Sequence, residues 1–168
     1  MESGTWHIDA ARSTVRVSIR HLGVTTVRGT FEDVEGKLQL AEDGSAAVAA
    51  SIGTASISTG DPKRDEFLAS PEFFDAAAHP RATFVASGRA LASAPSVLAG
   101  TLTIAGTSAP LELTVELEED RDRPRLRVRV RADVDRHAFG LRFPQAAGAG
   151  DVAVGRKATL MAAISLGA

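Results

Sequence analysis

The feature that most constrains this fold is the alternation of apolar and polar residues at every second position. In Ser13–His21 the valines and the isoleucine fall on one face, and the arginines fall on the other. This period is typical of a strand with one buried face. The same pattern predicts further strands at Thr25–Phe31, Gly36–Leu40, Ala46–Ile52, Ala82–Arg89, Ser96–Ala105, Pro110–Glu118, Arg125–Asp133 and near Arg156–Leu166. Many strands in succession indicate an antiparallel barrel or sandwich. With 168 residues and no linker, we expect one domain over residues 1–168.

One segment, near residues 61–75, breaks the strand pattern. Asp61 followed by Pro62 is typical of a helix start, with a capping carboxylate and a proline at the first helical position. Four of the seven phenylalanines lie between Phe67 and Phe84. Aromatic area concentrated in a connection favours a plug or pocket wall. We therefore predict a short helical insert that closes one end, with an ordinary packed helix as the alternative.

The basic residues of the hairpin formed by Pro110–Glu118 and Arg125–Asp133 predict a solvated face and not a nucleic-acid site. They share the parity of the glutamates on the preceding strand; the residues are Arg125, Arg127, Arg129 and Arg131, and Glu112, Glu116 and Glu118. Pairing across the Glu119–Pro124 turn is expected to set Glu118 against Arg125. The same register would place Leu117 against Leu126 on the inner face. The net charge of −2 and the pI near 6.1 give no global attraction to nucleic acid.

Residues for covalent, metal or phosphate chemistry are scarce in this sequence. The absence of cysteine excludes disulfides, thiolate zinc sites and a cysteine nucleophile. The four histidines, His7, His21, His79 and His137, lack the spacing of a helical metal motif. No G-x-S-x-G motif occurs, and the P-loop-like stretch that starts at Gly150 carries Arg156 in place of lysine and precedes a strand. We predict no catalytic residue and no metal site, and a hydrolase with a His/Asp site assembled in space is an alternative.

The predicted inner faces favour a cavity. An eight-stranded barrel is either just filled by side chains or able to hold one small ligand. Small residues recur on the inner faces, including Gly29, Ala50 and Gly100. An eight-residue strand spans roughly 26 Å, which is long enough for an extended apolar chain to lie beside it. A filled barrel, in which the small residues only let opposite walls approach, is the alternative.

The chain resembles the YceI-like family over nearly its full length. The matching motifs are Trp6-His7-Ile8-Asp9, Val27-Arg28-Gly29-Thr30-Phe31, Ile57-Ser58-Thr59-Gly60, Arg64-Asp65, Phe73-Phe74-Asp75, His79-Pro80, the stretch from Gly100 to Gly106 and the stretch from Asp135 to Leu141. The resemblance implies an all-β fold, an extended antiparallel lipocalin-like barrel around a long amphiphile such as a polyisoprenoid or an isoprenoid quinone. It also implies no enzymatic step, no cofactor beyond that bound lipid, and a homodimer.

Under this resemblance, the ligand's apolar tail lies in the barrel and its head group lies toward the mouth. The expected lining residues are Val17, Ile19, Phe31, Phe67, Phe73, Phe74, Phe84, Leu102, Ile104, Leu113, Val115, Val128 and Val130. His21 and Arg136 are the candidates for head-group contact. We expect Arg64 and Asp65 to pair and hold the insert in place.

The N-terminus bears on where the protein acts. Many relatives are exported, but the start of this chain has neither a basic segment nor an apolar core typical of a signal peptide. We therefore expect a cytoplasmic protein. No apolar run approaches about 18 residues, so no transmembrane segment is expected. A stress-response interaction module whose bound lipid is incidental is a further alternative to lipid carriage.

Overall fold

The structure is a computed structural model that describes residues 3–89, 95–119, 125–144 and 150–168. The strands are β1 (Gly4–Ile8), β2 (Thr14–His21), β3 (Thr25–Phe31), β4 (Val34–Leu40), β5 (Ser45–Gly53), β6 (Ile57–Ser58), β7 (Arg81–Arg89), β8 (Ser96–Ile104), β9 (Thr107–Glu119), β10 (Arg125–Asp135) and β11 (Val154–Gly167). The helix α1 spans Pro62–Ala69. Every predicted strand is present, whereas the short strands β1 and β6 were not predicted.

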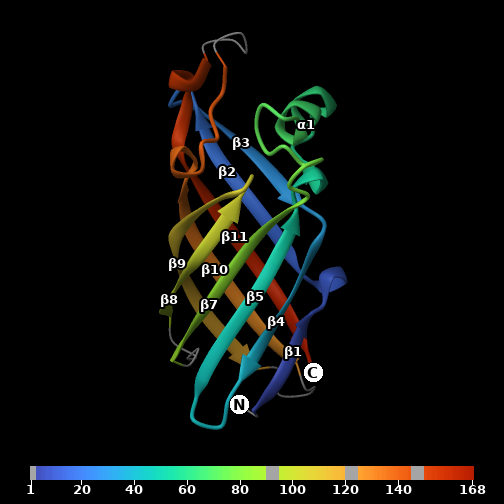
Figure 1. Cartoon of the computed structure of the whole chain (residues 1–168), viewed down its shortest axis with the longest axis vertical. Helices are drawn as coiled ribbons and strands as arrows, with labels where there is room; N and C mark the ends of the chain where they lie inside the picture. The colour runs from blue at the N-terminus through green and yellow to red at the C-terminus, as the bar shows by residue number, and fades with distance from the viewer. Residues whose placement is uncertain (1–2, 90–94, 120–124, 145–149) are drawn as a thin grey trace.

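The strands form a closed antiparallel barrel. The order β1-β4-β5-β7-β8-β9-β10-β11 returns to its start because β11 also pairs with β1, which gives a ring of eight strands. Figure 1 shows this ring, with α1 beside one of its ends. Closure on itself identifies the fold as a barrel and not a sandwich, and it leaves the ring without an unpaired edge.

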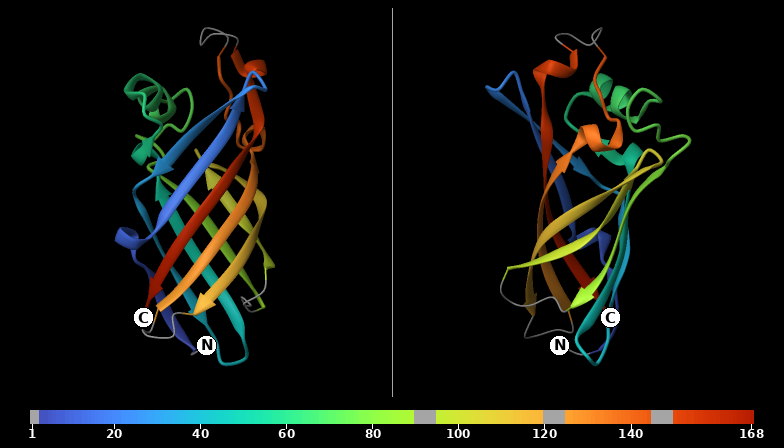
Figure 2. Two further views of the ribbon diagram at one scale, coloured as in Figure 1. Left: turned by 180° about the vertical axis from the view of Figure 1, so that it is seen from behind. Right: turned by 60° about the vertical axis from the view of Figure 1, so that its left-hand side comes forward.

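Strand β11 is long enough to pair with two different strands along the same edge. Near its C-terminus it pairs with β1, through His7 opposite Gly167, and farther back it pairs with β2 from Ala163 to Val154. Strands β2 and β3 therefore extend the wall past the ring, as Figure 2 shows. We call the end that carries α1 and the β2–β3 turn the insert end. The opposite end, where β1 begins and β11 ends, is the terminal end.

The β9–β10 register corrects the sequence prediction. Glu118 lies opposite Arg127 and not opposite Arg125, so the predicted pairing is wrong by two residues. A shift of two keeps the parity of a strand, so every side chain stays on its predicted face. Leu117 and Val128 are buried, and Arg129 forms an ion pair with Glu118 on the outside. The rest of the turn, residues 120–124, lies outside the described residues.

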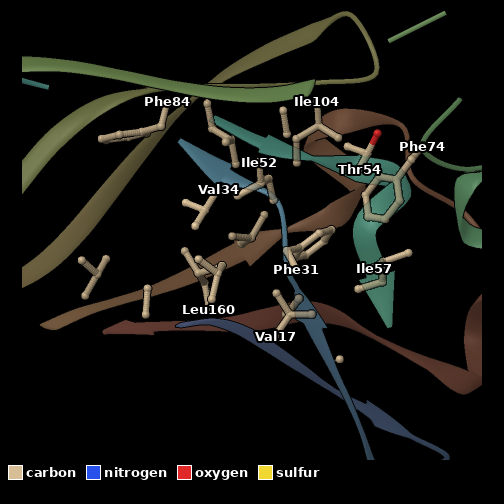
Figure 3. Close-up of a pocket in the computed structure, with 18 of the residues that line it drawn as sticks. Val17, Phe31, Val34, Ile52, Thr54, Ile57, Phe74, Phe84, Ile104 and Leu160 are labelled. Carbon is tan, nitrogen blue, oxygen red and sulfur yellow. The ribbon is translucent and has the colours of Figure 1, made fainter. Parts of the chain in front are cut away.

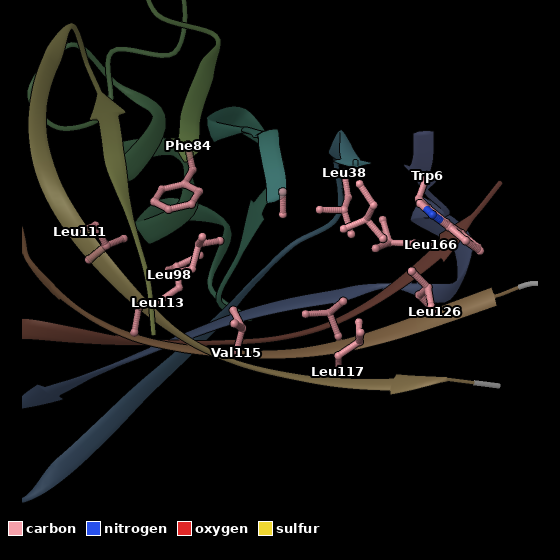
Figure 4. Close-up of a cluster of buried hydrophobic side chains, with 14 residues drawn as sticks. Trp6, Leu38, Phe84, Leu98, Leu111, Leu113, Val115, Leu117, Leu126 and Leu166 are labelled. Atoms are coloured by element: carbon pink, nitrogen blue, oxygen red, sulfur yellow. The ribbon is translucent and has the colours of Figure 1, made fainter. Parts of the chain in front are cut away.

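The terminal end is filled by a cluster of large aliphatic side chains around one tryptophan (Figure 4). Leu38 is only 2% exposed, and Trp6, Leu126 and Leu166 pack with it. Close packing of this kind contributes most of the hydrophobic stabilisation of a small barrel. The terminal end is therefore the packed core of the barrel.

The insert begins as predicted. The Asp61 carboxylate accepts a hydrogen bond from the Lys63 amide at 3.0 Å, and Pro62 is the first helical residue. The predicted pairing of Arg64 with Asp65 is corrected, because each side chain bonds to Thr59. Asp65 Oδ1 accepts from the Thr59 amide and hydroxyl at 2.9 and 2.6 Å, and Arg64 Nε donates to the same hydroxyl at 2.8 Å. The two residues still fasten α1 to the chain that follows β6.

Candidate functional site

A cavity of about 660 Å³ lies within the barrel. Figure 3 shows its wall, with side chains from several strands directed toward a common space. All the residues expected to line it do so: Val17, Ile19, Phe31, Phe67, Phe73, Phe74, Phe84, Leu102, Ile104, Leu113, Val115, Val128 and Val130, together with His21 and Arg136. Whether these residues touch a ligand stays a prediction.

Two of the small inward residues have different effects on the cavity. A side chain at Gly100 would place its Cβ 2.5 Å from Cζ of Phe84, so the glycine lets that ring lie against the neighbouring strand. Ala50, by contrast, lies on the cavity wall without a large side chain of its own. The interior is therefore partly filled by aromatic area and partly left as space.

The charge of the lining has one sign. Among the described lining residues no aspartate or glutamate occurs. Two of the basic ones, Lys63 and Arg64, come from α1, and His21 comes from the last position of β2. The cavity therefore has an apolar body, with three basic groups from α1 and β2 at the insert end and Lys37 on β4, opposite His7 of β1, toward the terminal end. Sequence reasoning missed Lys63, although its place beside Arg64 on the predicted insert was visible.

Aromatic rings form one wall of the cavity at the insert end. The rings of Phe67 and Phe143 stack at 5.9 Å between centroids, and Phe73 lies 4.9 Å from Phe143. Phe74 meets Phe73 edge to face at 4.9 Å and reaches Phe31 of β3 at 6.0 Å. Aromatic pairs at these separations stabilise one another beyond their buried area. Phe143 was not predicted, and its only signal in the sequence is its place two residues after the Phe139-Gly140-Leu141 stretch.

Arg136 holds the insert end together from within and offers nothing to a ligand. It is 3% exposed, and all five of its N–H donors are bound by the protein. Nε donates to the Gly155 carbonyl at 2.8 Å, and the terminal nitrogens donate to the carbonyls of Leu141, Asp151 and Val154 and to the Asp151 carboxylate. We therefore withdraw Arg136 as a head-group candidate and retain His21.

Asp151 is the counterpart of Arg136. Its Oδ1 accepts from Arg136 and from the Phe143 amide at 3.0 Å, and its Oδ2 lies 2.8 Å from Nε2 of His137. The Arg136 guanidinium holds the pKa of Asp151 far below the usual value of 3.8. Oδ2 thus joins the His137 side chain of η3 (Arg136–Phe139) to η4 (Gly150–Ala153), and Oδ1 joins the backbone after η3 to the same element, so the His137–Asp151 contact has a structural explanation.

Metal chemistry finds no support in the described ranges. No three side chains of histidine, aspartate or glutamate converge there in a way that could hold an ion. What the arrangement offers chemically is a deep apolar space with most of its basic groups near one end, which is typical of a binding site for an extended amphiphile.

The comparisons with known proteins agree with this fold. A family model described as a YceI-like domain matches residues 6–166. The chain belongs to the YceI-like family. Residues Trp6 to Leu166, the bounds of that match, cover all of the barrel ring except the first residues of β1 and the last of β11.

Among curated relatives, Protein YceI of Escherichia coli O157:H7 is 33% identical over 105 residues. Protein YceI of Salmonella arizonae shows the same identity over the same length. The aligned part covers 61% of this chain and 55% of each relative. The chain thus spans about half the length of the curated YceI proteins that it matches.

Solved structures share the fold. BcnA of Burkholderia cenocepacia superposes with a TM-score of 0.81 at 20% identity, over 94% of this chain and 98% of BcnA. A polyisoprenoid-binding domain from Saccharophagus degradans gives 0.75 at 14% identity, over 99% of both chains. The YceI protein of Campylobacter jejuni gives 0.69 at 22% identity, over 87% of both chains. In the described part of this YceI-like chain, no helix is long and apolar enough to cross a membrane.

Proposed function

We propose that this YceI-like barrel binds or carries one long-chain amphiphile, a polyisoprenoid or an isoprenoid quinone. The observation that carries the proposal is the cavity of about 660 Å³, whose described lining is apolar apart from a few hydroxyl, amine and guanidinium groups and the His21 imidazole. Pockets of roughly 300–1,000 Å³ with such linings are typical of small-molecule sites. The Saccharophagus relative, described as polyisoprenoid-binding, supports the same ligand class.

The energetics favour a long apolar chain over a small polar ligand. Each methylene group transferred from water into the cavity stabilises the complex by about 0.8 kcal/mol, before the cost of ordering the chain. Hydrogen bonds contribute little along the walls, because side chains such as Leu113, Val128 and Ile164 offer no donor or acceptor. Length and width of the tail would therefore set selectivity more than polar recognition.

The direction of the ligand follows from the two ends of the barrel. The terminal end is filled by the cluster around Trp6 and Leu38, so a tail would stop against that core. The head group would lie at the insert end, near His21 and Lys63. Binding without catalysis, a homodimer and a cytoplasmic location complete the proposal, and these three parts rest on the sequence and the family resemblance.

The proposal is tested by placing a tryptophan side chain in the cavity, where it would take the space of the lipid. Leu113 and Val128 are buried and line the cavity, so we expect Leu113→Trp or Val128→Trp to remove most lipid while the barrel stays folded. The matched control is Thr114→Trp, which adds the same side chain on the exposed outer face of β9. Native mass spectrometry of freshly purified protein, followed by organic extraction, measures the lipid bound to each variant, and far-ultraviolet circular dichroism checks the fold.

The outcomes separate the proposed functions. A discrete isoprenoid or quinone at near one per chain, lost in both interior variants and kept in the control, supports carriage. Equal lipid in all four proteins would place the lipid outside the barrel and contradict the proposal. A bare mass after incubation with prenols and quinones would instead favour the interaction module.

A further inference from the structure

The turn between β2 and β3 exposes two apolar side chains to water. Val24 is 80% exposed and Leu22 is 60% exposed. Leu22 and Gly23 have φ values of 54° and 69°, a left-handed pair typical of tight hairpin turns. Asparagine and glycine suit such positions, and a leucine there is strained. Leu22 therefore gains neither burial nor a favourable backbone within the folded chain.

The hairpin that carries this tip is positively charged. Between residues 14 and 31 it contains Arg16, Arg20 and Arg28 and no aspartate or glutamate, although the whole chain has a net charge of −2. The strands that pair with this hairpin, β11 and β6, also carry no aspartate or glutamate. Beyond them, Asp135 at the end of β10 binds Arg156, and Asp151 in η4 binds Arg136. The tip thus combines exposed apolar area with a local excess of cationic groups.

The tip also adjoins the cavity. His21 and Val27, which flank the turn on β2 and β3, both line the cavity. In the described residues, β3 pairs with β6 only at Thr30 and Phe31, so its stretch Thr25–Gly29 has β2 as its one strand partner. Figure 2 shows the β2–β3 turn projecting at the insert end, on the side away from α1. Lipid entering or leaving at the insert end would therefore pass beside this turn.

We propose that the Leu22–Val24 tip docks the barrel on a bilayer surface that carries anionic lipid, from which the amphiphile is taken up or to which it is returned. This inference rests on the proposed function. Arg20 precedes Leu22 by two residues, which corresponds to about 7 Å along a strand. Arg28 follows Val24 by four residues, which corresponds to about 13 Å. The Arg20 guanidinium reaches forward to the turn, where Nη1 donates to the Gly23 carbonyl at 3.2 Å. Interfacial segments insert about 5–10 Å into the headgroup region, so Arg20 would lie among the lipid phosphates once the tip is inserted.

The expected contact is weak and reversible. Two apolar side chains at a tip bury far less area than an amphipathic helix does, and each basic group near an anionic surface adds only a small further attraction. The affinity for the vesicle should fall as salt is added, because the Debye length shortens from about 10 Å at 0.1 M to about 3 Å at 1 M salt. A transient contact suits a protein that must leave the surface with its ligand.

Co-sedimentation with vesicles tests the proposal. Wild type is compared on phosphatidylcholine vesicles and on vesicles of phosphatidylcholine with one quarter phosphatidylglycerol, at low and high salt. The Leu22→Asn and Val24→Thr double variant keeps the turn geometry and removes the apolar tip. Its matched control, Val85→Thr and Val97→Thr, changes two valines that are 53% and 64% exposed on the barrel wall. We expect about a tenfold or greater loss of vesicle binding in the tip variant alone, and a wild-type signal that needs the anionic lipid.

Native mass spectrometry of the same samples keeps this inference separate from the proposed function. A tip variant that retains its lipid but no longer sediments with vesicles supports docking by the tip. Wild type that carries lipid but does not bind anionic vesicles overturns the inference and leaves the proposed function standing. Equal vesicle binding by tip variant and control also overturns it. A Leu22-dependent dimer without vesicle binding would assign the tip to a second copy of the chain, against the membrane.

Discussion

The two ends of this barrel are built from different interactions. At the terminal end, Trp6 and Leu38 pack with other aliphatic side chains contributed by paired strands. At the insert end, stacked phenylalanines and the hydrogen bonds of the buried Arg136 join short elements that are not part of the ring. Aliphatic packing on a closed ring is tolerant of small adjustments, whereas a network of directed hydrogen bonds fails when one member is removed. The comparison indicates that the fold is secured at one end and that the binding geometry is set at the other.

The largest expected effect comes from Arg136→Met, which tests whether the insert end depends on this one buried side chain. The change removes five hydrogen-bond donors, four of which serve backbone carbonyls, and it takes from the Asp151 carboxylate its buried cationic partner, which leaves His137 and the exposed Arg142 at 3.7 Å beside it. Removing one partner of a buried ion pair costs about 3–5 kcal/mol. Chemical denaturation measures the loss in the free energy of unfolding.

Arg129→Met is the matched control for that experiment. Arg129 makes an ion pair with Glu118, but its side chain is 63% exposed on the outer face of β10. Exposed pairs contribute about 0–1 kcal/mol. Equal losses in the two variants would contradict the view that Arg136 organises the insert end.

A smaller effect is expected from Phe143→Ala. The ring stacks on Phe67 and Phe73 and lies 5.1 Å from the Arg136 guanidinium, but it is only half-buried. We expect a loss of about 1–3 kcal/mol, in the ordinary range for a single truncation. Hydrogen exchange is the sharper measurement, because the amides of α1 should exchange faster while those of the β9–β10 pair do not change.

Leu38→Ala gives the opposite pattern and serves as the comparison for Phe143→Ala. Leu38 lies in the packed terminal end, where truncation of a buried leucine costs about 2–5 kcal/mol. Because that core supports the whole ring, exchange should rise throughout the barrel. A rise confined to the terminal end, or a global rise in the Phe143 variant, would count against the division into two ends.

The smallest expected effect is the dependence of the protein's stability on pH in the acid range. The pKa of Asp151 is lowered in the folded state, chiefly by Arg136, so the unfolded chain takes up a proton at a higher pH than the folded chain does. The stability from this carboxylate is therefore complete above its unfolded pKa near 3.8 and is lost as pH falls below that value. Denaturation midpoints between pH 2 and pH 5 should fall less steeply in Asp151→Asn than in wild type, and parallel curves over that range would refute the assignment.

The strands were predictable from the sequence because one face of each is buried. Alternation located β3 at its observed bounds and placed Val17, Leu113 and Val128 on the inner wall. The same period explains the error in the β9–β10 register. Shifts by two residues preserve both the apolar and the charged face, and only the geometry of the turn distinguishes them.

The parts that sequence reasoning missed depend on contacts between distant segments. Phe143 and Asp151 lie outside any strand pattern, and their roles arise only when η3, η4 and the insert meet. Arg136 was expected to face a head group, because a lone arginine near a mouth gives no sign in the sequence of which carbonyls will surround it. Closure of the ring by five-residue β1 was likewise invisible, since a short strand carries too few alternations.

The pairing of His7 with Gly167 brings the first and last strands together at the terminal end, and Figure 1 shows both ends of the chain there, away from α1. A tag or linker fused to either end would leave the barrel on the side opposite α1. The protein attached to a sensor chip through such a linker would present the insert end to the solution. Exchange of the proposed lipid ligand with flowing vesicles could then be followed in real time on one immobilised layer.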